Sequence, residues 1–149
     1  MSRTVDTNIL VYASDSGSPV HQQASTLMQE LLRGPELTTV FWPVLESYLR
    51  IVTHPAICSS PLPIAMAHQA VEAVLASPSI RVVAEGANFW RCYTQIGGGR
   101  GNDVPDAVIA ALMLEHGVST IYTRDRDFRR YPAISVRDPF PDRVVHGQR

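Results

Sequence analysis

The stretch Val104–Phe128, VPDAVIAALMLEHGVSTIYTRDRDF, decides the fold of this chain. Its first part is an apolar run that starts after Asp103 and stops at Gly117, which predicts a buried helix with a glycine end. The segment STIYT at 119–123 is rich in β-branched residues and predicts a strand directly behind that helix. A helix that returns the chain to such a strand is typical of α/β domains with a parallel sheet.

The rest of the chain repeats this alternation of strands and helices. We expect further strands at 3–6, 36–40, 80–84 and 134–138, and helices at 7–13, 20–33, 42–52, 63–76 and 87–96, with a glycine-rich loop at 97–102 and one helical turn at 127–131. The sequence therefore predicts a three-layer α/β fold, in which a mostly parallel sheet is flanked by helices. Its length of 149 residues indicates one domain over 1–149, with a C-terminal tail from about 139 to 149.

Charge and apolar patterning narrow the function classes. The formal net charge is −1 from 13 basic and 14 acidic residues, and a pure nucleic-acid binder is usually clearly basic. Every basic residue is arginine, and four of them lie within 124–130. Such a cluster suits phosphate contacts and equally suits a solvated surface. No apolar run is long enough for a membrane span, and the N-terminus does not read as a signal peptide, so we expect a cytoplasmic protein.

Several acidic residues each have a structural explanation when taken alone. Asp6 follows the first expected strand and suits the cap of the next helix. Asp103, Pro105 and Asp106 suit a helix start, with Asp103 at the N-cap and Asp106 at its third position. Asp125 and its neighbour Asp127 follow the strand at 119–123, where acids at a first helical turn are ordinary.

Taken together, three of these acids point to a metal site. Asp6 and Asp125 stand at the carboxyl ends of expected strands, where α/β sheets gather their ligand sites, and Asp106 opens the helix that leads into one of them. Carboxylates that converge in this way repel one another. Bound Mg²⁺ or Mn²⁺ relieves the repulsion, because both ions prefer oxygen ligands, and such an ion can activate water against a phosphodiester. The sequence therefore predicts a metal-dependent phosphodiesterase site.

The chain resembles PIN-domain ribonucleases, and most closely the toxins of VapBC-type toxin–antitoxin pairs in their mycobacterial-style branch. The likeness runs from Val5 to Pro139 and rests on an ordered set of segments: VDTNILVYA at 5–13, WPVLESYLRIVTHP at 42–55, SPSIRVVA at 77–84, DAVIAALMLEHG at 106–117, YTRDRDF at 122–128 and YPAISVRDP at 131–139. It implies a PIN-like fold and an endoribonuclease that uses Mg²⁺ or Mn²⁺ to hydrolyse RNA. It also implies a VapB-like antitoxin partner and a toxin homodimer.

The resemblance assigns roles to individual residues. Asp6, Glu46, Asp106 and Asp125 are the expected catalytic acids, with Asp6, Asp106 and Asp125 as metal ligands; Asn8, Asp103, Thr123 and Asp127 are supporting residues. Apart from the resemblance, the glycine-rich loop and the arginine cluster make Arg100, Arg124 and Arg126 the expected RNA contacts. The second acid departs from the family pattern. The family's glutamate stands three residues before Arg50, where this chain has Ser47, and Glu46 is one place earlier. A shift of one residue turns a side chain by about 100° on a helix.

The sequence is compatible with three functions. The convergent acids favour an active ribonuclease toxin. The displaced Glu46 and the near-neutral charge favour a catalytically weak PIN module that binds RNA or a partner protein. A DNA-directed, structure-specific nuclease uses the same kind of metal site, but a chain of this length lacks room for the clamping elements of such enzymes.

Overall fold

The computed structural model describes residues 2–58 and 60–141. Along the chain its elements are β1 (Arg3–Val5), α1 (Thr7–Ser14), α2 (His21–Arg33), β2 (Thr38–Phe41), α3 (Trp42–Val52), α4 (Ile64–Ala76), β3 (Ile80–Val83), α5 (Phe89–Gln95), η1 (Gly101–Asp103), α6 (Val104–His116), β4 (Thr120–Tyr122), η2 (Arg126–Arg130) and β5 (Ser135–Arg137). The η elements are short 3₁₀ helices. Each expected strand and helix is present, with ends that lie at most two residues from the predicted ones.

All strand pairs in the described structure are parallel. The strands β1, β4 and β5 form one sheet in the order β1-β4-β5, and β2 pairs with β3. The two sheets meet where β2 lies beside β1, and there Nε of Arg3 donates to Oγ1 of Thr38 at 3.0 Å. The register Val5↔Tyr122 brings the carboxyl ends of β1 and β4 to the same edge of the sheet.

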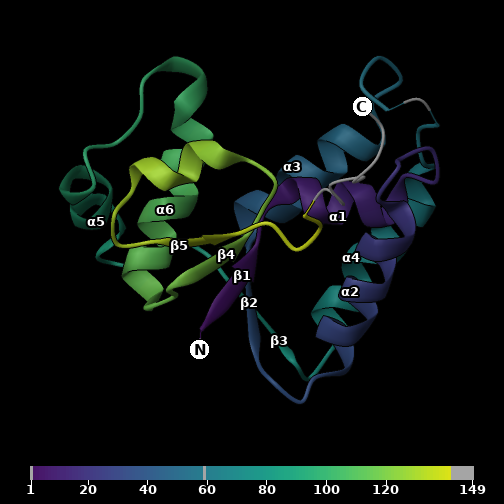
Figure 1. Cartoon of the computed structure of the whole chain (residues 1–149), viewed down its shortest axis with the longest axis horizontal. Coiled ribbons are helices and arrows are strands. Elements are labelled where there is room, and N and C mark those ends of the chain that lie inside the picture. Colours follow the sequence, from purple (N-terminus) through teal and green to yellow (C-terminus); the bar gives the residue numbers. More distant parts are fainter. Residues whose placement is uncertain (1, 59, 142–149) are drawn as a thin grey trace, which may run out of the picture.

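Helices cover the strands on both sides, as Figure 1 shows. In that view α5 and α6 lie on one side of the strands, and α1, α2 and α4 lie on the other. Helix α5 packs against α6, whereas α1 packs against α2 and α3. The prediction of a three-layer α/β domain with a mainly parallel sheet is confirmed.

Helix α6 forms the centre of the core because almost all of its middle is apolar. Its residues Ala107 and 109–113 are buried. It ends at Gly117, whose φ of 68° lies in the left-handed region that favours glycine. At its other end, a Cβ on Gly99 would lie 2.7 Å from the carbonyl oxygen of Asp103. Only glycine therefore lets the loop before α6 pack against the start of the helix.

Two details differ from expectation. Asp103 stands at the N-cap of α6 but makes no capping hydrogen bond, so the predicted capping box is wrong. The expected C-terminal tail begins with ordered packing, because Phe140 is buried in the core. The remainder of that expected tail, residues 142–149, lies outside the described residues. Within the described ranges, the helices are all too short or too polar to cross a membrane.

Candidate metal centre

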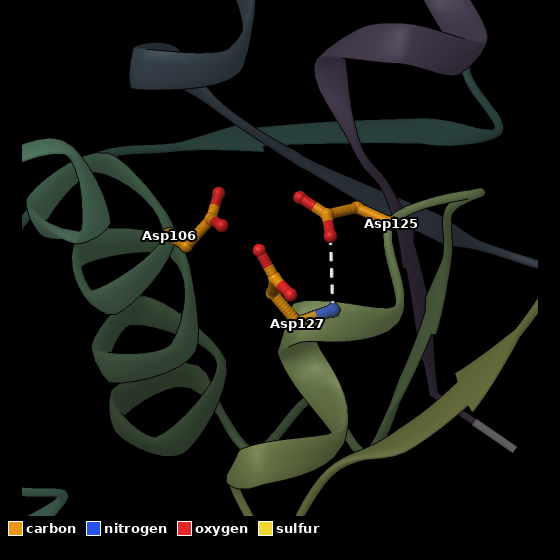
Figure 2. A group of neighbouring side chains, drawn as sticks. All are labelled: Asp106, Asp125 and Asp127. Atoms are coloured by element: carbon orange, nitrogen blue, oxygen red, sulfur yellow. Dashed lines mark hydrogen bonds between the residues drawn. The ribbon is translucent and has the colours of Figure 1, made fainter.

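Three aspartates gather between helix α6 and the turn that follows β4. Asp106 lies in the first turn of α6, and Asp125 and Asp127 lie at the start of η2. One carboxylate oxygen from each lies within 4.8 Å of the others. Figure 2 shows the three side chains pointing into one space, Asp106 from the helix and the other two from the turn. The turn is held by Oδ1 of Asp125, which accepts from the backbone N of Asp127 at 2.9 Å.

Asp6 lies beside this cluster but is held by other groups. It follows β1 and caps α1, where its Oδ1 accepts from the backbone N of Thr7 at 2.7 Å. Its Oδ2 accepts from the hydroxyl of Thr123, also at 2.7 Å. The side chain is buried, with 8% of the residue exposed. Asp6 therefore fulfils the predicted capping role and at the same time places a negative charge next to the three clustered carboxylates.

The hydroxyl of Thr123 connects the acidic residues. Besides donating to Asp6, it accepts from Nδ2 of Asn8 at 3.2 Å and from the backbone N of Asp125 at 2.9 Å. One donor and two acceptor positions are all that a hydroxyl offers, so Thr123 is fully used. Asn8 is thereby oriented, while its Oδ1 is buried without a hydrogen-bond partner among the described residues. That oxygen is a hydrogen-bond acceptor that no described group uses.

Burial and neighbouring charge change the proton affinity of Asp106 and Asp6. Burial, followed by the charges of Asp6 and Asp125, raises the pKa of Asp106 to about 7, against the lowering effect of Arg130. Burial also raises the pKa of Asp6, against the lowering effect of its hydrogen bonds to Thr123 and Thr7. Burial and mutual repulsion make it unfavourable for several carboxylates to be ionised together in such a site unless a cation is bound. An all-oxygen donor set whose charge is only partly compensated fits a divalent cation of the Mg²⁺ or Mn²⁺ class.

Arg130 supplies partial compensation from the rim of the cluster. Its Nη1 lies 3.2 Å from Oδ2 of Asp103, and its Nη2 lies 3.9 Å from Oδ2 of Asp106. The guanidinium also lies over the ring of Tyr131, 5.3 Å from the ring centre. Asp103 thus pairs with Arg130 and is not one of the three clustered carboxylates. Sequence reasoning treated Arg130 only as part of an arginine-rich run, although its spacing of three from Asp127 in a short 3₁₀ turn is the signal for a shared face.

Glu46 is not brought into the cluster. It is exposed on α3, and it is not among the charges that raise the pKa of Asp106. The neighbouring Ser47 instead lines a hollow of about 240 Å³ that also contains Asp6 and Asp106. Ser47, where the resemblance expects a glutamate, therefore lines the same hollow as two of the acids and carries a hydroxyl there.

The three arginines expected to contact RNA have different surroundings. Arg100 is exposed in the loop before η1. Arg124 is partly buried, with its Nε 3.5 Å from Oδ2 of Asp138, whereas Arg126 is exposed. Of these three arginines, Arg124 and Arg126 line a hollow together with Asp125, whereas Arg100 does not.

The chain matches the family model described as PIN domain over residues 4–134. It is 43% identical to Ribonuclease VapC48 of Mycobacterium tuberculosis over 143 residues, which cover 94% of this chain and 99% of that protein. It is 32% identical to Ribonuclease VapC43 of the same species, over 91% of this chain and 93% of that one.

Solved structures agree in fold. VapC20 of Mycobacterium tuberculosis, a toxin described as cleaving the sarcin–ricin loop, is similar with a TM-score of 0.64 at 21% identity, over 86% of this chain and 93% of VapC20. FitAcB from Neisseria gonorrhoeae has a TM-score of 0.63 at 20% identity, over 93% and 99% of the two chains. The carboxylate cluster, the matched family model and the curated relatives agree: the chain belongs to the PIN-domain family and, within it, to the VapC ribonucleases.

Proposed function

We propose that this VapC-type chain is the toxin of a type II toxin–antitoxin pair and cuts RNA internally at the cluster of Asp106, Asp125 and Asp127. The observation that carries the proposal is the meeting of these three carboxylates within 4.8 Å, beside a fourth acid, Asp6, in a site where the pKa of Asp106 is raised to about 7. A site with this negative charge is suited to a divalent cation, and a bound cation would in turn attract the phosphate of a nucleic-acid substrate.

The three clustered carboxylates would hold Mg²⁺ or Mn²⁺. When bound, such an ion activates water and stabilises negative charge on a phosphodiester. We propose this set because its carboxylate oxygens lie within 4.8 Å of one another. Asp6, predicted as a ligand with Asp106 and Asp125, lies beside it, and each of its oxygens accepts one hydrogen bond and keeps a lone pair for a cation. Asp6 contributes negative charge from its place beside Asp106. Asn8 and Thr123 fix the orientation of Asp6 and of the Asp125 backbone.

Cleavage tests decide between the ribonuclease and its alternatives. Purified protein with Mn²⁺ or Mg²⁺ is expected to cut a structured RNA and to leave a DNA of the same sequence intact. Asp106→Asn and Asp6→Asn should each abolish cutting, and excess chelator should do the same. Cutting that persists in both variants would overturn the assignment, and preferential cutting of DNA would favour a structure-specific DNA nuclease.

The position of Glu46 supports one second candidate, a catalytically weak PIN module. With Glu46 exposed and Ser47 in its place, the site has one carboxylate fewer than the family pattern. Under this alternative, expression of the chain leaves growth unaffected while a partner protein still copurifies. Growth arrest that disappears with Asp106→Asn would support the toxin instead.

The partner that we propose is a VapB-like antitoxin. Solved relatives of the same fold include a toxin–antitoxin complex from Klebsiella pneumoniae and VapBC-1 from nontypeable Haemophilus influenzae. This chain offers an apolar groove of about 150 Å³ between α1, α2, α3 and α4, lined by residues that include Leu10, Met28, Leu45, Val71 and Val74. Coexpression with the product of the neighbouring reading frame should yield a stable complex without ribonuclease activity.

We also propose a homodimer in the cytoplasm, where RNA is available. Light scattering of the purified chain, alone and in complex, tests the oligomeric state. A monomer at micromolar concentration would contradict the dimer without affecting the assignment of the metal centre.

A further inference from the structure

A second hollow borders the acidic cluster along the turn after β4. Its volume is about 290 Å³, and it is lined by Thr123, Arg124, Asp125, Arg126, Arg129, Val136, Asp138 and Pro141. Thr123 and Asp125 belong to both places: Asp125 offers an oxygen to the carboxylate cluster, and Thr123 orients it. A ligand in the hollow would therefore be an immediate neighbour of a group bound at the cluster.

The three-residue period of η2 explains why arginines and aspartates separate here. In a 3₁₀ helix the side chains at i and i+3 lie above one another. Phe128 and Tyr131 form the buried face. Asp127 and Arg130 are directed toward α6, where they meet Asp106. The third face presents Arg126 and Arg129 together, and both line the hollow.

Three arginines, Arg124, Arg126 and Arg129, give the hollow its positive charge. The two aspartates that also line it offset this charge only in part. Arg124 lies 3.5 Å from Asp138, whose Oδ1 accepts from the backbone N of Phe140 at 2.8 Å, so this pair is fixed to the chain. Arg126 and Arg129 are exposed, and within residues 2–58 and 60–141 no ion pair engages either of them. Guanidinium groups that remain available for bidentate hydrogen bonds suit a phosphate group.

We propose that this hollow is a phosphate subsite for the RNA strand, in which Arg126 and Arg129 bind the phosphate next to the one that is cut. The inference rests on the proposed function and deepens it. One short helix then has two tasks: its aspartate face serves the cleavage centre, and its arginine face fixes the neighbouring part of the strand.

Binding measured without divalent cations tests the subsite separately from cleavage. The probe is a short fluorescein-labelled single-stranded RNA of mixed sequence, mixed with the full chain in excess EDTA, and the readout is anisotropy at several salt concentrations. Each phosphate contact to a single strand contributes a slope of about 0.7 in the logarithm of affinity against the logarithm of salt. Arg126→Gln/Arg129→Gln should weaken binding by about tenfold or more near 50 mM salt and, because the two arginines share one phosphate, reduce the slope by about 0.7.

The matched control removes the same charge from elsewhere. Arg50 on α3 and Arg81 on β3 are exposed and lie outside the hollow, so Arg50→Gln/Arg81→Gln should leave the slope within about 0.3 of the unmodified chain. Thermal unfolding checks that both double variants are folded, and unchanged Mn²⁺ affinity checks that the carboxylates are undisturbed.

Three results would overturn the subsite. The first is an equal loss of slope in both double variants, since this reports net charge alone. The second is an unchanged slope in Arg126→Gln/Arg129→Gln, including the case where the unmodified chain does not bind the RNA at the lowest salt. The third is normal RNA binding together with loss of the partner protein, which would make the hollow a protein-binding surface. Failure of the unmodified chain to cut RNA refutes only the proposed activity, because the slope is measured without cleavage.

Discussion

The hydroxyl of Thr123 donates to Oδ2 of Asp6 at 2.7 Å across 117 positions of the sequence. This bond joins the carboxyl ends of two neighbouring parallel strands, β1 and β4, and it exists because the register pairs Val5 with Tyr122. The same hydroxyl accepts from Asn8 and from the backbone of Asp125. One buried threonine therefore sets the relative position of acids that come from both ends of the chain.

Thr123→Val is expected to lower both stability and activity. The change keeps the shape of the side chain but leaves the groups of Asp6, Asn8 and Asp125 without their partner, which costs about 1–3 kcal/mol for buried polar groups. Loss of an orienting hydrogen bond at a metal site typically lowers metal affinity or activity by about 10–100-fold. Urea unfolding and RNA cleavage with Mn²⁺ measure the two effects.

Thr4 provides the control for that substitution. It is fully buried on β1, and its hydroxyl has no hydrogen-bond partner among the described residues. Thr4→Val should therefore be neutral or stabilising, because it removes a buried polar group that has no partner. If both valine variants lose stability equally, the hydrogen bonds of Thr123 are not the cause.

The stability of the cation-free protein should fall as the pH rises through the range in which Asp106 titrates. The ordinary pKa of this carboxyl is 3.8, and burial together with the charges of Asp6 and Asp125 raises it to about 7, so the folded state holds the proton over a range where the unfolded state has lost it. Stability linked to this group is therefore fully present below about pH 4, falls between about pH 4 and pH 7, and stays level above. Asp106→Asn removes the effect.

Thermal unfolding in EDTA measures this dependence. At about pH 8, Asp106→Asn should unfold several degrees above the unmodified chain, since about 1 kcal/mol corresponds to roughly 2–4 °C for a chain slightly longer than this one. The difference should shrink toward pH 5. Glu72→Gln, on an exposed position of α4, should show no such trend. A difference that grows toward low pH would contradict the assignment.

Mn²⁺ affinity should rise with pH over the same range. A carboxylate must lose its proton before it can bind a metal ion, and with a pKa of about 7 for Asp106 the affinity should increase roughly tenfold between about pH 6 and pH 8. Titration calorimetry in buffers of different ionisation enthalpy should detect the released proton. Asp106→Asn should bind Mn²⁺ weakly and without this pH dependence. An affinity that is constant in the unmodified chain would argue against Asp106 as a ligand.

Substitutions at Glu46 and Ser47 test the departure from the glutamate position that the resemblance predicts. Glu46 is exposed, whereas Ser47 lines the hollow that contains Asp6 and Asp106. Glu46→Gln should therefore leave cleavage within about twofold, because surface changes away from such features have small effects. Ser47→Glu should add a carboxylate to the site and raise Mn²⁺ affinity. Loss of cleavage in Glu46→Gln would restore Glu46 to the catalytic set.

The elements of the fold were predictable because each carries a local signal. The apolar run of α6 with its glycine end, and the β-branched segment behind it, are determined by residues close together in the chain. The gathering of Asp6, Asp106 and Asp125 near one edge followed from the topology of parallel strands. The ends of elements were less accurate, because hydrophobic periodicity says little about the last residue of a helix or strand.

The membership of the carboxylate cluster was not predictable from spacing alone. Asp103 and Asp127 both stand within three residues of an expected ligand, yet only Asp127 joins the cluster. The difference depends on contacts that sequence does not give: Arg130 engages Asp103 at 3.2 Å, and the 3₁₀ conformation of η2 turns Asp127 toward α6. An α-helical turn in the same place, with about 3.6 residues per turn, would direct these side chains elsewhere.

The division of η2 into an apolar face, an acidic face and an arginine face also constrains how this protein can evolve. Individual side chains on each face are open to substitution, but the number of residues between Asp125 and Tyr131 is not. Insertion or deletion of a single residue would shift every later side chain to the next face, moving an arginine to where a carboxylate belongs and a charge into the core. We therefore expect related nucleases to vary in composition here far more than in length.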